Sequence, residues 1–216
     1  MTLWDQFWSN SEKRQWWEEP TQEVLELIGA NSPHERAQVL DLGCGLGRHA
    51  IAFAQAGFKV TAIDGSKTAV KHLRDWASQL GLDTQTLHGD VLDPRLPKEF
   101  FDIVLSYNVI YHGYREQFEA AIQYVFRLLK PGGLFYFTCP SREDGKYGFG
   151  EEAAPHTYLS TKSIIPGDMH YFSNEADLDE LLRDFVLLSR SKDEGYFENR
   201  CAQQFFSNWQ VLAQKP

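Results

Sequence analysis

Apolar runs of strand length alternate with amphipathic stretches of helical length along most of this chain. The runs are VLDL at 39–42, KVTAID at 59–64, QTLHGD at 85–90, FDIVLSY at 101–107 and LFYFTC at 134–139. Apolar residues also recur every three or four positions over 69–80 and 118–129, which is typical of helices with one buried face. This alternation predicts an α/β fold, in which helices on both faces cover a doubly wound, mainly parallel sheet.

The last part of the chain predicts the rest of that sheet. Ser173 or Asn174 is suited to cap a helix through Leu182, with acidic residues in its first turn. Two apolar runs follow, FVLLSRS at 185–191 and FFSNWQVLAQK at 205–215, and the polar segment KDEGYFENRC separates them. Because such neighbouring strands pair as an antiparallel hairpin, the sequence predicts a seven-stranded sheet with a C-terminal antiparallel hairpin.

Net charge favours a small-molecule partner over a nucleic acid. The chain has 30 acidic and 21 basic residues, a net charge of -9, and no lysine and arginine cluster longer than a pair. Nucleic-acid binding draws much of its affinity from basic contacts with phosphates. We therefore expect a small-molecule substrate and no nucleic-acid partner.

Cysteine spacing and hydropathy favour a cytoplasmic protein without a metal site. Cys44, Cys139 and Cys201 lie far apart, without the CxxC or Cys/His spacing of a disulfide framework or a zinc site. No window approaches the roughly 18 apolar residues of a membrane span, and the N-terminus lacks the apolar core of a signal peptide. We expect a soluble, unprocessed protein in a reducing cytoplasm, with no membrane contact.

The segment VLDLGCGLGRH places Gly43, Gly45 and Gly47 between a predicted strand and a predicted helix. Backbone N–H groups and a helix N-terminus then lie beside a ligand. The dinucleotide motif GxGxxG needs a third glycine where this chain has Arg48, and the Gly-Lys-Ser/Thr of a phosphate loop is absent. Asp64 follows the first glycine by about twenty residues, where a carboxylate accepts hydrogen bonds from both ribose hydroxyls. The ligand is thus predicted to carry a ribose but no pyrophosphate.

Five motifs in chain order resemble those of the class I S-adenosylmethionine-dependent methyltransferases. They are VLDLGCGLG at 39–47, VTAIDGS at 60–66, HGDVLD at 88–93, FDIVLSYNVIYH at 101–112 and LLKPGGLFYF at 128–137. The resemblance covers most of residues 39–139. It implies a Rossmann-like fold, S-adenosyl-L-methionine as cofactor and S-adenosyl-L-homocysteine as product. The residues agree with it, since this cofactor has a ribose and an adenine but no pyrophosphate.

The resemblance implies that the methionine end of the cofactor lies at the glycine turn. Asp41 and the turn from Gly43 to Gly47 would hold it, and Cys44 would pack there rather than act as a nucleophile. A carbonyl at Ser106 or Tyr107 would accept from its amino group. Arg48 either reaches the methionine carboxylate or is a solvated surface residue.

For the nucleoside end, the resemblance implies a second set of residues. Asp64 would accept from the ribose hydroxyls, and Asp90 from the adenine amino group. The Val91 N–H would donate to a ring nitrogen, while Val91 and Gly65 pack on the purine faces.

The chain, 1–216, is predicted to form a single methyltransferase domain, because 216 residues are too few for two enzymatic domains. Residues 34–139 would form its cofactor-binding core, and 173–216 its last helix and two strands. Residues 1–33, with four of the six tryptophans, are expected to be a helical lid. Residues 140–172 are expected to be a long loop that serves as a substrate lid, since long loops often bind ligands.

Methyl transfer from a sulfonium is an in-line displacement, in which the enzyme chiefly aligns the acceptor in a dry pocket. Ligands of this fold lie beyond the carboxyl ends of the strands, which predicts that 107–115 lies beside the methyl group. Tyr111, His112 and Tyr114 are therefore the candidate catalytic residues. His112 is a candidate base because histidine titrates near neutral pH, and its alternative is a ring bonded to backbone at a helix start.

Aromatic residues outside this segment are candidates for contact with the acceptor. The candidates are Trp16, Trp17, Tyr147, Phe149, Tyr158, His170 and Tyr171. A cage of such rings attracts a cationic amine. For the tryptophans, the alternative is a helix that packs its apolar face on the domain.

The sequence therefore predicts methyl transfer to an N, O or S atom of a small molecule, and three other functions stay open. A nucleic-acid or protein methyltransferase is one, although the D/N-P-P-Y/F motif and a Pro-Cys nucleophile are absent. A sensor that binds the cofactor without turnover is another. The third is an NAD(P)-dependent oxidoreductase, because Tyr158 and Lys162 match YxxxK. Its TGxxxGxG loop is absent, and Pro155 and Pro166 place the pair in a loop. The acceptor and the oligomeric state are not indicated.

Overall fold

The structure is a computed structural model of the chain. It describes residues 3–10, 17–31, 37–93, 95–163, 165, 167–199 and 202–216. The chain forms two compact units. Met1–Leu105 with Leu128–Lys130 make up the first unit, and Ser106–Arg127 with Pro131–Pro216 make up the second.

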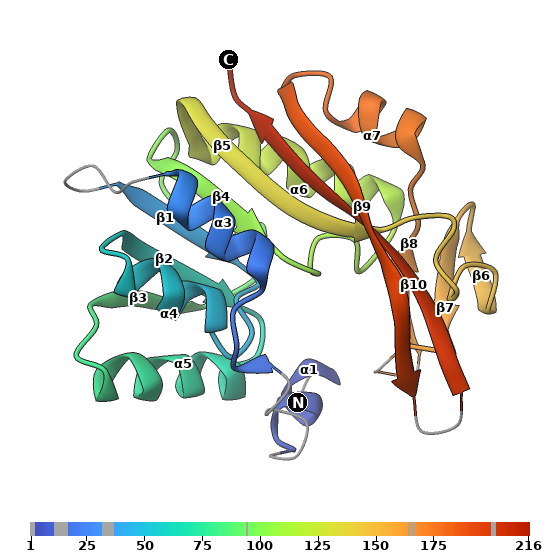
Figure 1. Cartoon of the computed structure of the whole chain (residues 1–216), viewed down its shortest axis with the longest axis horizontal. Helices are drawn as coiled ribbons and strands as arrows, with labels where there is room; N and C mark the ends of the chain where they lie inside the picture. Colours follow the sequence, from blue (N-terminus) through green and yellow to red (C-terminus); the bar gives the residue numbers. More distant parts are fainter. Residues whose placement is uncertain are drawn as a thin grey trace. The chain divides into compact units, whose positions relative to one another are not determined.

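A seven-stranded sheet has the strand order β3-β2-β1-β4-β5-β10-β9 (Figure 1). Its strands are β1 Gln38–Leu42, β2 Lys59–Asp64, β3 Thr84–His88, β4 Phe101–Ser106, β5 Leu129–Pro140, β9 Val186–Asn199 and β10 Ala202–Gln214. β1 pairs in parallel with β2 and β4, and β2 with β3. β10 pairs antiparallel with both β5 and β9. The predicted α/β fold with a C-terminal antiparallel hairpin is therefore confirmed.

Helices of the first unit follow the predicted pattern. They are α1 Leu3–Trp8, α3 Gln22–Ala30, α4 Arg48–Gln55 and α5 Lys67–Gln79. α4 contacts β1 and β2, and α5 contacts β2 and β3. α5 begins two residues before the predicted range, because the Ser66 side chain caps it by accepting from the Ala69 N–H at 3.2 Å. Its apolar face, which includes Val70 and Leu73, is buried.

The second unit contains α6 Arg115–Leu128 and α7 Glu175–Leu181. Asn174, one of the two predicted caps, caps α7 in a reciprocal capping box. Its side chain accepts from the Asp177 N–H at 2.9 Å, and the Asp177 carboxylate accepts from the Asn174 N–H at 2.8 Å. No helix of the described ranges is both long and apolar enough to cross a membrane.

The two last strands are longer than the sequence predicts. Most of the polar segment, Lys192–Asn199, belongs to β9, and β10 begins at Ala202. The two strands pair from Val186 and Gln214 to Asn199 and Ala202, with one register shift between Leu212 and Ala213. The rings of Tyr196 and Phe205 lie on opposite strands, 5.3 Å between centroids. Such cross-strand pairs stabilise a ribbon whose sequence lacks apolar alternation.

The prediction of a long loop at 140–172 is wrong. The segment contains β6 Gly150–Ala154, β7 Thr157–Ser160 and β8 Asp168–Tyr171, which form an antiparallel sheet in the order β6-β7-β8. Polar Thr157 and Ser160 of β7 are fully buried, so the strand lacks the alternation of apolar and polar residues that reveals strands in a sequence. The YxxxK pair accordingly begins in a strand and not in a helix. The role of this segment as a lid stays a prediction.

Candidate active site

The glycine turn after β1 has a conformation that only glycine adopts easily. Gly43, Gly45 and Gly47 have φ values of 79°, 53° and 94°. A Cβ on Gly47 would lie 2.2 Å from Cδ1 of Leu73, which packs beneath the turn. The Gly43 and Cys44 N–H groups donate to the Ile63 carbonyl at 2.8 and 3.0 Å and so fix the turn to β2. Cys44 is buried, and its packing role stays a prediction.

Asp64 joins the end of β2 to this turn, although it is 19 residues from Gly45 in sequence. Its Oδ2 accepts from the Gly45 N–H at 2.8 Å, and its Oδ1 accepts from the Ser66 N–H at 2.8 Å. Burial raises the pKa of Asp64, and the two backbone bonds oppose that rise. Each carboxylate oxygen keeps lone pairs with which it can accept from further hydroxyls.

Asp41 is a buried carboxyl group within β1, with 2% of the residue exposed. Its Oδ2 has no hydrogen-bond partner among the described residues. Burial, and next the charge of Asp64, raise the pKa of Asp41 to about 7, while the Ala50 N–H and Arg48 oppose the rise. A buried oxygen of this kind favours a cationic donor, because the donor would both satisfy its lone pairs and stabilise its charge. The residues present thus fit the amino group of a bound methionine.

The N-terminal helix covers the glycine turn. The Trp8 side chain is buried, and its Cζ2 lies 3.2 Å from the position of a Cβ on Gly45. The Asp5 carboxylate accepts from the Ser66 hydroxyl at 2.7 Å, at the beginning of α5. Neither Asp5 nor Trp8 is among the predicted site residues, and the density of tryptophans is a signal that points to Trp8 alone.

Arg48 contacts the N-terminal segment, and its two predicted alternatives stay predictions. Its guanidinium donates to the Glu19 carbonyl at 3.2 Å and lies 5.1 Å from the centroid of the Trp17 ring. Trp17 also packs edge-on against Trp8, with centroids 5.7 Å apart. Arg48 thus ties the N-terminal segment to α4, whereas Trp16 lies outside the described residues.

Residues predicted for the nucleoside lie on the loops after β2 and β3. The Gly65 carbonyl is 3.1 Å from His88 Nε2, and Asp90 is exposed, with its Oδ1 accepting from the Leu92 N–H at 3.0 Å. Val91 is half-buried beside it. Because β2 and β3 are parallel neighbours, the two loops follow the same edge of the sheet.

At the end of β4, Ser106 is buried and Tyr107 is half-buried. Asn108 follows in a left-handed conformation, with φ 60°. Thr138 of β5 holds it there, since its Oγ1 accepts from the Asn108 N–H at 2.8 Å and donates to Asn108 Oδ1 at 2.9 Å. These bonds fix the direction in which the chain leaves β4.

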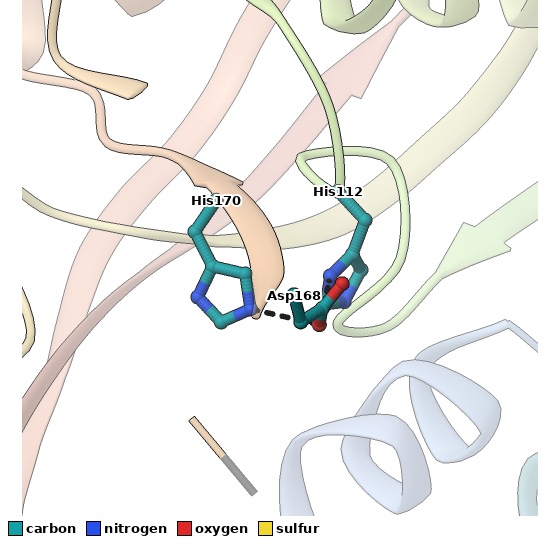
Figure 2. A group of neighbouring side chains, drawn as sticks. All are labelled: His112, Asp168 and His170. Atoms are coloured by element: carbon teal, nitrogen blue, oxygen red, sulfur yellow. Dashed lines mark hydrogen bonds and ion pairs between the residues drawn. The ribbon is translucent and has the colours of Figure 1, made fainter. Parts of the chain in front are cut away.

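Two histidine side chains of the second unit contact one carboxylate, that of Asp168 (Figure 2). Asp168 Oδ2 lies 2.9 Å from His112 Nδ1 and 3.0 Å from His170 Nε2. Burial alone would raise the pKa of Asp168, but hydrogen bonds from His112 and His170 outweigh it and hold that pKa well below its usual value. Burial lowers the pKa of His170 to about 4. Asp168 is therefore ionised and His170 neutral at neutral pH.

Tyr111 belongs to the same cluster. Its ring stacks on that of His112 with centroids 4.3 Å apart, and meets that of His170 edge-on at 5.3 Å. The Tyr171 N–H donates to the Tyr111 carbonyl at 3.0 Å, which joins the loop after β4 to β8. Asp168 is not among the predicted site residues, because a D-x-H pair signals a shared face only once its segment is recognised as a strand.

The remaining acceptor candidates make other contacts. Tyr147 donates to or accepts from His156 Nδ1 at 2.7 Å, and its ring meets that of buried Tyr158 at 5.3 Å. Tyr171 is buried against Phe118. Tyr114 and Phe149 are exposed, and the ammonium of Lys162 lies over the Phe149 ring. Of the predicted acceptor residues, Tyr111, His112 and His170 lie together with the Asp168 carboxylate.

Sequence comparison places this chain among known methyltransferase sequences. A family model described as a methyltransferase domain matches residues 39–133. An S-adenosyl-L-methionine-dependent Diels-Alderase from Neonectria sp. (strain DH2) is 32% identical over 155 residues, which cover 68% of this chain and 59% of that protein. A ubiquinone biosynthesis O-methyltransferase from Rickettsia prowazekii is 25% identical over 195 residues, covering 85% and 75%. The chain spans less than two thirds of the length of some curated relatives, 59% in the Neonectria protein and 47% in another.

Structural comparison agrees with the strand order. The solved 1,6-didemethyltoxoflavin-N1-methyltransferase of Burkholderia thailandensis, with bound 1,6-didemethyltoxoflavin and S-adenosylhomocysteine, superposes with a TM-score of 0.70. The alignment covers 97% of this chain and 84% of that one, at 20% identity. At that identity the likeness shows the fold alone.

Proposed function

Because this chain belongs to the class I S-adenosylmethionine-dependent methyltransferases, we propose that it transfers the methyl group of S-adenosyl-L-methionine to an N, O or S atom of a small molecule. The buried, unsatisfied Oδ2 of Asp41 is the observation that supports this most. It lies in the strand that leads into the glycine turn, where a cationic amino group would satisfy it. When bound, the cofactor supplies an electrophilic methyl group on a sulfonium.

Residues of the first unit hold the cofactor in this proposal. Asp41 pairs with the methionine amino group, and the lone pairs that Asp64 retains accept from the ribose hydroxyls. The Asp64 carboxylate also accepts from the Gly45 N–H, so the group that binds the ribose is joined to the turn that receives the methionine. Trp8 covers that turn and excludes water from it, which favours displacement at a sulfonium.

The acceptor is assigned to the segment that follows β4, with Tyr111 and His112 as the residues that bind it. Ligands of open α/β sheets lie beyond the carboxyl ends of the strands, and this segment begins at such an end. The net charge of -9 favours a small molecule over a nucleic acid. Small-molecule methyltransferases among the relatives and structural neighbours support the same class, and a cytoplasmic location stays the prediction from cysteine usage.

Two measurements test this proposal. Calorimetry with S-adenosyl-L-methionine, S-adenosyl-L-homocysteine and NADP should show binding of the first two alone, and binding of NADP alone would overturn the family-based assignment. Release of S-adenosyl-L-homocysteine is then followed with a panel of phenols, amines, thiols and carboxylates. Turnover with one class supports the proposal. Tight cofactor binding without turnover across the panel would favour a sensor.

A further inference from the structure

Two backbone features bring His112, Asp168 and His170 together in the second unit. Asp168 and His170 are two residues apart on β8, so both side chains lie on one face of that strand. His112 comes from the loop after β4, which the Tyr111 carbonyl joins to the Tyr171 N–H of β8. Figure 2 shows both rings beside the Asp168 carboxylate. One potential ligand atom from each residue lies within 4.8 Å of the others.

Contacts of the His112 ring identify which nitrogen carries hydrogen. His112 Nε2 lies 3.1 Å from the Asn108 carbonyl oxygen, which can only accept, so Nε2 is the donor. In the neutral ring, Nδ1 then carries a lone pair, and it lies 2.9 Å from Asp168 Oδ2. A hydrogen on Nδ1 that is donated to Asp168 Oδ2 accounts for this contact, and so does a cation that both atoms bind.

The Asn108 carbonyl occupies the position that usually fixes a metal-binding histidine. Such histidines donate their other ring N–H to a backbone carbonyl or a carboxylate. Asn108 is held in place by Thr138, so the orientation of the His112 ring is built into the end of β4.

We propose that His112, Asp168 and His170 bind a divalent transition-metal ion. Such an ion binds imidazole nitrogen and carboxylate oxygen at about 2.1 Å, and two ligands at the right angle of six-coordinate geometry then lie about 3.0 Å apart. The two distances to Asp168 Oδ2, 2.9 and 3.0 Å, match that separation. Two imidazoles and one carboxylate favour zinc or ferrous iron, whereas magnesium and calcium prefer sites made of oxygen alone.

The cluster is buried but not closed. The His112, Asp168 and His170 side chains are 16%, 10% and 4% exposed, so His112 is the most accessible of the three. Three protein ligands leave a coordination position for water or for an oxygen of a substrate. An acceptor oxygen bound there would lose its proton more readily, a use of the metal that rests on the proposed function.

Metal binding is tested directly on the untagged full chain after treatment with a chelator. Zn²⁺ and Co²⁺ are titrated by calorimetry, with Mg²⁺ as the comparison, and bound Co²⁺ is followed by its visible absorption. We expect one Zn²⁺ or Co²⁺ per chain, a higher melting temperature with Zn²⁺, and much weaker binding of Mg²⁺. The variants His112→Gln, Asp168→Asn and His170→Gln should each lower Zn²⁺ affinity by about tenfold or more, since even residues behind the ligands change it by about 10-fold to 100-fold.

His72→Gln is the matched control, because His72 lies on α5 in the first unit and should leave the metal affinity unchanged. Binding of S-adenosyl-L-homocysteine shows that each variant is folded. Zn²⁺ binding that survives all three cluster variants, or a folded wild type that binds neither Zn²⁺ nor Co²⁺, would overturn the proposal and assign the cluster to an ion pair with doubly protonated His112. If the metal-free protein still transfers methyl groups, only the proposed use of the metal in the reaction is contradicted. If the protein binds the metal but transfers no methyl group, the metal site is supported and the proposed function is contradicted.

Discussion

Replacing Asp41 by asparagine tests the electrostatics beneath the glycine turn. The pKa of this buried carboxyl is 3.8 in an unperturbed chain and about 7 in the folded one. The folded state therefore binds the proton more tightly. The contribution of this proton binding to the free energy of unfolding is fully present below about pH 4 and is lost as the pH rises to about 7. A difference of about 3 pH units, at about 1.4 kcal/mol each, makes the ionised group cost about 4 kcal/mol above pH 7.

D41N cannot ionise, so it should escape this loss. At pH 5 the wild type has lost roughly 1.5 kcal/mol, and at pH 8 about 4 kcal/mol, so the stability difference between the proteins should change by about 2 to 3 kcal/mol in favour of D41N. Urea denaturation of the ligand-free proteins at both pH values measures it. Asp83→Asn, which removes a carboxylate that is 94% exposed, is the control and should follow the wild type.

The same substitution, which should stabilise the ligand-free protein at pH 8, should weaken ligand binding. At pH 8, D41N should bind S-adenosyl-L-homocysteine more weakly by about 1.5 to 3 kcal/mol, because an amide loses the charge-assisted bond to the amino group. The reasoning is refuted if D41N and wild type change stability in parallel between the two pH values. Unchanged ligand affinity in D41N would remove Asp41 from the cofactor site.

Three further predictions concern single side chains. Asp64→Ala should lower S-adenosyl-L-homocysteine affinity by about 1 to 3 kcal/mol, and a folded variant with full affinity in calorimetry would remove Asp64 from the ribose site. Gly47→Ala should destabilise the protein by about 2 kcal/mol or more in urea denaturation, because the new Cβ would meet Leu73. Gly81 also has a positive φ but lies in open space, so Gly81→Ala should cost only about 1 kcal/mol. Equal losses in the two variants would contradict the packing argument. Asn174→Ala should cost about 1 kcal/mol through loss of the α7 cap, measured by the same denaturation, and an unchanged midpoint would mean that the cap is redundant.

The cofactor side of this protein could be predicted because its signals are local. Each motif there is a strand followed by a turn and a helix, so a few adjacent residues show both the conformation and the ligand. The apolar run before Gly43 predicts β1, and the spacing to Asp64 reflects the length of one strand–helix–strand unit. In the structure, Asp64 indeed accepts from the Gly45 N–H.

The acceptor side could not be predicted to the same depth, because its contacts join residues far apart in the chain. Asp168 lies 56 positions after His112, in a strand whose buried threonine and serine hide it from any periodicity rule. The backbone bond between Tyr111 and Tyr171 is the contact that brings the two segments together. The sequence alone thus determined the sheet and the family of ligand. Only the tertiary structure decided which carboxylate meets His112, because that choice depends on strand pairing at long range.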